Sequence, residues 1–104
     1  MIVVSDTTPL SSLILLDRLY LLRIIYSKVL LFVEVAEELY KIPHLKSAII
    51  KNNSWINICP LQNLENKKML RKILDEGESA AIALAIERSI NFILIDERKE
   101  KNVA

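Results

Sequence analysis

Four short apolar runs, separated by segments with helical spacing, constrain the fold of this chain more than any other feature. The runs are rich in β-branched and other apolar side chains and cover residues 2–4, 29–33, 55–59 and 92–95. Runs of this kind predict buried strands. Short buried strands that alternate with helices are typical of a mostly parallel sheet with helices on both faces. We therefore predict an α/β fold with three layers, α/β/α, around a mostly parallel four-stranded sheet.

The segments between the runs predict the helices. Thr8 followed by Pro9 indicates a helix start, with Thr8 as the cap and Pro9 at the first helical position. Helical spacing continues to Ile25, with a break expected near Asp17. Further helices are predicted over residues 34–41, 44–52, 63–74 and 78–88, and a last one is predicted to begin near Glu97.

Length and composition fit one folded domain over residues 1–104. Of the 104 residues 52% are hydrophobic and 26% charged, which is enough apolar material for a core. The net charge of +1 does not indicate a general phosphate-neutralising surface, so any nucleic-acid contact must be local or must be assisted by a partner or a second subunit. The sequence stops within a helical pattern, so we expect the C-terminus to be incomplete.

Cysteine usage and hydropathy bear on the location of the protein. Cys59 is the only cysteine, which excludes an intrachain disulfide and a cysteine-based zinc site. This usage fits a reducing cytoplasm, where we expect the protein to act. Charged residues interrupt the most apolar segment, residues 13–33, so no membrane span is expected.

Two carboxylates follow predicted strands directly. Asp6 comes after the first strand, and Asp96 comes after the last. Parallel strands would bring both to the same edge of the sheet, where open α/β sheets bind ligands. Asp6 has no evident structural role, because Thr8 and Pro9 already provide a helix start. Asp96 has the alternative role of a helix N-cap, and Glu97 competes with it for any acidic function.

Glu38 is a candidate chosen from three acids of one predicted helix. At 100° per residue it lies at the border of the apolar face, between Val35 and Ile42. Glu37 lies opposite that face. A solvated acidic face explains Glu38 as well as a functional role does, and the spacing leaves both open.

Glu78 has two interpretations of similar weight. Asp75 and Glu78 have the spacing of a capping box at a helix start. Glu78 is also in line with Ile82 and Ile86, which we expect to form the inward stripe of that helix.

Grouped carboxylates indicate a particular chemistry. Like charges repel when they are crowded together, unless a cation is bound or pKa values rise. Mg²⁺ and Mn²⁺ prefer oxygen ligands, and such ions activate water and orient a phosphodiester for cleavage. A single His and a single Cys argue against a metal centre with softer ligands.

Four segments resemble the acidic motifs of the PIN-domain family, which includes VapC-like toxin ribonucleases, and in particular those of an uncharacterised prokaryotic branch. The segments are IVVSDTTPL at residues 2–10, VAEEL at 35–39, DEGESAAIALA at 75–85 and ILIDERK at 93–99. They occur in the family's order and span nearly the whole chain. Family members usually continue to another helix and a fifth strand, which this sequence lacks.

The resemblance implies metal-dependent RNA cleavage, with Mg²⁺ or Mn²⁺ as the cofactor. By the same resemblance Asp6, Glu38, Glu78 and Asp96 are the metal ligands or water-activating acids. Arg98 and Lys99 are candidates for phosphate contact, although a solvated helix start explains them equally. Many members are toxins paired with an antitoxin protein, and homodimers are common.

Two questions stay open at the level of sequence. A truncated, inactive PIN-like domain that serves as a binding module or a remnant is the alternative to an active ribonuclease. The second question concerns the basic face of the helix over residues 63–74, which is either a solvated surface or a contact for RNA or an acidic partner. That face comprises Lys67, Lys68, Arg71 and Lys72.

Overall fold

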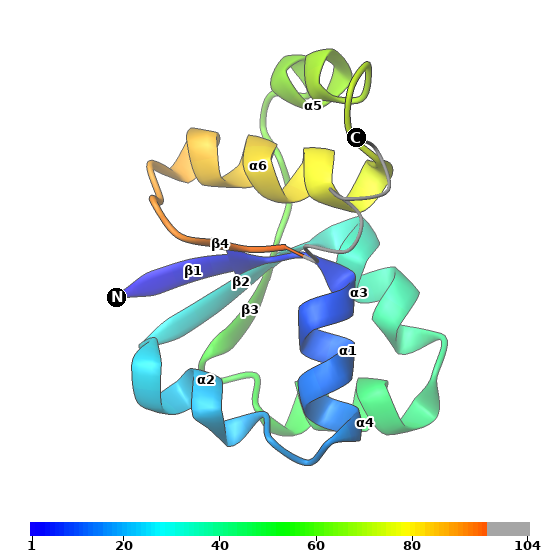
Figure 1. Ribbon diagram of the computed structural model, residues 1–104, viewed down its shortest axis with the longest axis vertical. Helices are drawn as coiled ribbons and strands as arrows, with labels where there is room; N and C mark the ends of the chain where they lie inside the picture. The colour runs from blue at the N-terminus through cyan, green and yellow to red at the C-terminus, as the bar shows by residue number, and fades with distance from the viewer. Residues whose placement is uncertain (96–104) are drawn as a thin grey trace.

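A parallel sheet of four strands lies between two layers of helices. Figure 1 shows the computed structural model, which describes residues 1–95 of the chain. The strands are β1 (Ile2–Ser5), β2 (Lys28–Phe32), β3 (Ile56–Cys59) and β4 (Ile93–Leu94). Their order across the sheet is β3-β2-β1-β4, and each pair is parallel. The predicted α/β class and the predicted parallel sheet are confirmed.

Six helices cover the sheet within the described part of the chain. They are α1 (Thr7–Leu15), α2 (Tyr20–Ile25), α3 (Val33–Tyr40), α4 (Pro43–Lys51), α5 (Glu65–Leu70) and α6 (Glu76–Arg88). Helix α6 covers one face and α5 lies beyond it, whereas α1 to α4 lie on the other side (Figure 1). Among the helices of residues 1–95, none is both long and apolar enough to cross a membrane.

The helices α3, α4 and α6 differ from their predicted bounds by one or two residues, α1 and α5 differ as follows, and one expected break is confirmed. The first helix begins at Thr7 rather than after Thr8, because Asp6 is its N-cap. The helix predicted over residues 63–74 is shorter, since α5 ends at Leu70. The break near Asp17 is confirmed, and Asp17 has a positive φ of 58°.

The core lies against the two central strands. Val3, Val4, Val29 and Leu31 are fully buried there. Burial of an aliphatic side chain of this size stabilises the fold by about 1.5–3 kcal/mol. Strand β4 is only half-buried, so its predicted burial is wrong; among residues 1–95 it pairs with β1 alone and lies at the edge of the sheet.

A carboxylate from α6 fixes the loop between β3 and α5. Both oxygens of Glu87 accept a hydrogen bond from the backbone N–H of Gln62, at 2.9 and 3.0 Å, and Oε1 also accepts one from Asn63 N–H at 2.9 Å. These backbone donors favour the charged form, so the pKa of Glu87 lies below its ordinary value of 4.5. The loop is thereby tied to α6.

This contact predicts a pH dependence of stability. A carboxyl group with a lowered pKa in the folded state stabilises it above the unfolded pKa, and the effect is lost as the pH falls through the folded pKa. We therefore expect Glu87→Gln to flatten the fall in melting temperature between about pH 6 and pH 3. Circular dichroism melts would measure it. Glu37→Gln, at an exposed position of α3, is the control, and an unchanged slope in Glu87→Gln would contradict the prediction.

Candidate active site

Asp6 lies at the carboxyl end of β1 and is fully buried. Its backbone is extended, and its Oδ1 accepts a hydrogen bond from Thr7 N–H at 2.7 Å. A short carboxylate in this position caps the helix and is favoured by the helix dipole. The expectation that Asp6 has no structural role is therefore wrong, because it is the N-cap of α1.

Gly77 brings the start of α6 against the Asp6 carboxylate. A Cβ atom at position 77 would lie 3.1 Å from Asp6 Cγ and would clash with Oδ1. The approach explains why a glycine occupies the first turn of a helix that otherwise consists of good helix formers. No role of its own was predicted for Gly77, which appeared only within the motif at residues 75–85. Its place as the chain's only glycine, inside an acidic motif, was the available signal for this contact.

Glu38 reaches the first turn of α1. Its Oε2 accepts a hydrogen bond from Thr7 Oγ1 at 3.2 Å. Because Thr7 directly follows Asp6, Glu38 contacts the residue next to Asp6. Glu38 was expected at the border of an apolar face that includes Val35 and Ile42. Val35 is buried, as expected, but Ile42 lies beyond the end of α3 and is exposed. Glu38 itself is exposed. It therefore faces solvent beside the sheet edge rather than pointing into the sheet.

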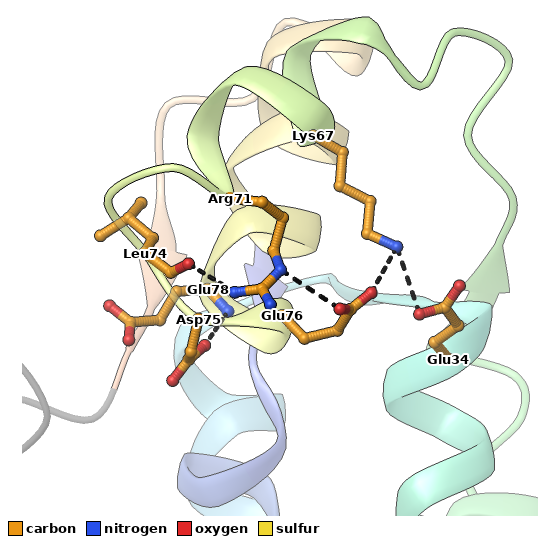
Figure 2. A network of polar contacts seen from close by, with 7 residues as sticks. All are labelled: Glu34, Lys67, Arg71, Leu74, Asp75, Glu76 and Glu78. Carbon is orange, nitrogen blue, oxygen red and sulfur yellow. Dashed lines mark hydrogen bonds and ion pairs between the residues drawn. The ribbon is translucent and has the colours of Figure 1, made fainter.

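Glu78 is buried in the first turn of α6, with 4% exposure. Its backbone N–H donates to Asp75 Oδ1 at 2.8 Å, which confirms Asp75 as the cap. The predicted inward position holds for Glu78 but is wrong for Ile86, which is 55% exposed, because the helix packs its alanines and Leu84 on the sheet. Figure 2 shows the Asp75 and Glu78 carboxylates together on one side of this turn, opposite Glu76.

An ion-pair network occupies the other side of the same turn (Figure 2). Lys67 Nζ lies 2.7 Å from Glu76 Oε1 and 3.2 Å from Glu34 Oε2, and Arg71 Nε lies 3.3 Å from Glu76 Oε2. Burial acts to lower the pKa of Lys67, but the hydrogen bonds and charges of Glu76 and Glu34 outweigh it and raise the pKa. The hydrogen bond from Lys67 lowers the pKa of Glu76. Half of the predicted basic face is therefore engaged within the fold.

The candidate acids are gathered in part. Asp6 lies against Gly77, which precedes Glu78, and Thr7 connects Asp6 to Glu38. Within residues 1–95, no three His, Cys, Asp or Glu side chains are close enough to hold one metal ion.

Four further predicted residues lie outside the described residues, namely Asp96, Glu97, Arg98 and Lys99.

Ser5 pairs with Leu94, so β4 ends at the same edge as β1. The donors in place are carboxylate oxygens, which suit a hard divalent cation.

The fold and the site together define a class of protein: an α/β domain with a parallel sheet and carboxylate side chains at the carboxyl edge of that sheet. A family model described as a PIN domain matches residues 2–104, so the chain belongs to the PIN-domain family. Membership confirms the predicted resemblance and gives the chain a fold of nuclease type. No curated protein and no solved structure matches the chain significantly.

Proposed function

We propose that the protein is a metal-dependent endoribonuclease that hydrolyses RNA phosphodiester bonds. The observation that carries this proposal is the burial of two carboxylates, Asp6 at 0% and Glu78 at 4% exposure, beside the carboxyl edge of a PIN-family sheet. This edge is where open α/β sheets bind ligands. Buried carboxylates at such an edge are suited to hold Mg²⁺ or Mn²⁺.

Each described acid has a distinct part in this proposal. Asp6 and Glu78 would bind the cation, since their side chains are shielded from solvent. Glu38, exposed and oriented by the Thr7 hydroxyl, would hold the attacking water or accept its proton. A bound divalent ion would lower the pKa of the water molecule that it coordinates and would neutralise negative charge on the phosphate.

The motif match supports proposed roles for the remaining residues. Asp96, or Glu97 beside it, would complete the acidic set, and Arg98 and Lys99 would contact phosphate. The same match supports a cytoplasmic toxin of a toxin-antitoxin pair, with a paired antitoxin and a homodimer as partners. Each of these is proposed from the motifs and the family, and the domain is proposed to span residues 1–104.

A single-turnover assay with labelled single-stranded RNA and Mn²⁺ tests the function. We expect cleavage that stops with EDTA and returns when Mn²⁺ is added in excess. Glu78→Gln keeps the shape of the side chain and removes its charge, so it should slow cleavage by at least about tenfold. Glu37→Gln is the matched control on an exposed acid and should cleave normally.

Two outcomes would contradict this proposal. Cleavage that persists in EDTA would exclude a metal mechanism. RNA binding without cleavage, at saturating Mn²⁺, would instead support an inactive PIN-like binding module.

A further inference from the structure

Lys67 connects the two helices that carry two of the candidate acids. Its ammonium group pairs with Glu34 on α3 at 3.2 Å and with Glu76 on α6 at 2.7 Å. Glu34 lies one helical turn before Glu38, and Glu76 lies two residues before Glu78. One cation therefore sits between the backbones that set the positions of Glu38 and Glu78 (Figure 2).

The surroundings of Lys67 differ from those of an ordinary surface lysine. Its side chain is only 13% exposed, although the side chains of Glu34 and Glu76 are 48% and 56% exposed and solvent screens that side of each pair. Its Nζ lies 5.1 Å from the ring centroid of Phe32, a buried residue that directly precedes α3. The ammonium is thus held over the start of α3 by the aromatic ring and by two carboxylates.

Helix α5 is attached through polar contacts on and beside it. It buries none of its residues, and Met69 is largely exposed. Arg71 adds to the polar contacts, since Nη1 donates to Leu74 carbonyl oxygen at 2.8 Å and Nε pairs with Glu76. The ion pairs therefore add to the Glu87 hydrogen bonds with the preceding loop, and they hold α5 across the start of α6.

A direct phosphate contact by Lys67 is the competing interpretation. Two carboxylates already neutralise this ammonium group, and an incoming phosphate would have to displace both. Lys68 is more open to solvent and makes no ion pair with any of residues 1–95. The geometry therefore favours a structural link at Lys67 over a phosphate contact, and Lys68 offers an exposed lysine outside the ion-pair network for comparison.

We propose that Lys67 is a positioning residue that fixes the first turn of α6 relative to α3, and with it the spacing between Glu78 and Glu38. This inference rests on the proposed function for its catalytic consequence. Its structural part, the fixed first turn of α6, can be measured separately.

Three variants test the inference. Lys67→Met keeps the length and removes the charge, Lys67→Arg keeps the charge, and Lys68→Met is the control. For Lys67→Met we expect faster amide hydrogen exchange in residues 78–80 and in α3. We also expect Mn²⁺ affinity to fall by about tenfold, and kcat to fall while KM for RNA stays unchanged. Lys67→Arg should restore most of each loss, and Lys68→Met should leave exchange, Mn²⁺ affinity and kcat unchanged.

The readouts separate this inference from the proposed function. A wild-type protein that neither binds Mn²⁺ nor cleaves RNA would overturn the function, and hydrogen exchange would still decide the role of Lys67. Wild-type exchange and Mn²⁺ affinity in Lys67→Met would overturn the inference. A rise in KM with unchanged kcat would overturn it too, because that result indicates substrate contact.

Discussion

Replacing Asp6 with Asn is expected to reduce metal-dependent cleavage by at least about a hundredfold while the fold stays intact. Asn caps helices as well as Asp does, so the start of α1 should be preserved. The change removes one negative charge from a fully buried position at the carboxyl edge. Single-turnover RNA cleavage and Mn²⁺ calorimetry would measure the loss.

The variant Asp6→Ala separates the two roles of this residue. Alanine cannot accept the hydrogen bond from Thr7 N–H, so Asp6→Ala should also lose about 0.5–2 kcal/mol of stability. Urea unfolding without metal would measure the difference between the two variants. Equal stability of the Asn and Ala variants would contradict the capping role, and an active Asn variant would contradict the metal role.

Adding a methyl group at Gly77 is expected to destabilise the protein by roughly 1–3 kcal/mol. The new Cβ would press on the Asp6 carboxylate, and either the start of α6 or the carboxylate would have to move. Gly77 has no positive φ, so backbone conformation does not oppose the change. Mn²⁺ affinity should fall together with stability, since the same carboxylate is displaced. Urea unfolding and calorimetry measure the two effects.

The double variant with Asp6→Ser provides the control, because the chain has no second glycine. Serine still caps α1 but lacks both carboxylate oxygens, and with them the Oδ1 atom that Cβ at position 77 would clash with. In that background Gly77→Ala should stabilise the protein by up to about 1 kcal/mol, as glycine is a poor helix former. The prediction is thus that Gly77→Ala destabilises the protein when Asp6 is present and stabilises it when Asp6 is replaced by Ser. Destabilisation of equal size in both backgrounds would show that Asp6 is not the obstacle.

The sheet could be predicted from sequence because its signal is local. Runs such as residues 29–33 are short, apolar and separated by helical segments, which fixes both strand and parallel topology. The cap of α1 could not be predicted so well, since Thr8-Pro9 is itself a valid start signal. Proline is accommodated at the third helical position because the first N–H groups of a helix have no intrahelical partner.

The parts of the site that failed to be predicted depend on contacts between distant segments. The inward face of α6 was assigned by large side chains such as Ile86, but the helix instead packs small alanines on the sheet. Lys67 was expected on a basic surface, but it pairs with Glu34, which lies 33 residues earlier in the sequence. Periodicity describes one helix at a time and carries no information on which neighbour it meets.

The double role of Asp6 limits how this position can change over time. The N-cap position of α1 favours Asp, Asn, Ser or Thr. Binding a divalent cation as proposed requires a carboxylate, Asp or the longer Glu, and Glu is not among the favoured N-cap residues. Aspartate alone meets both demands. A lineage that gave up its nuclease chemistry but kept its fold should therefore drift at this position toward Asn, Ser or Thr, so the residue found there would record which demand was relaxed.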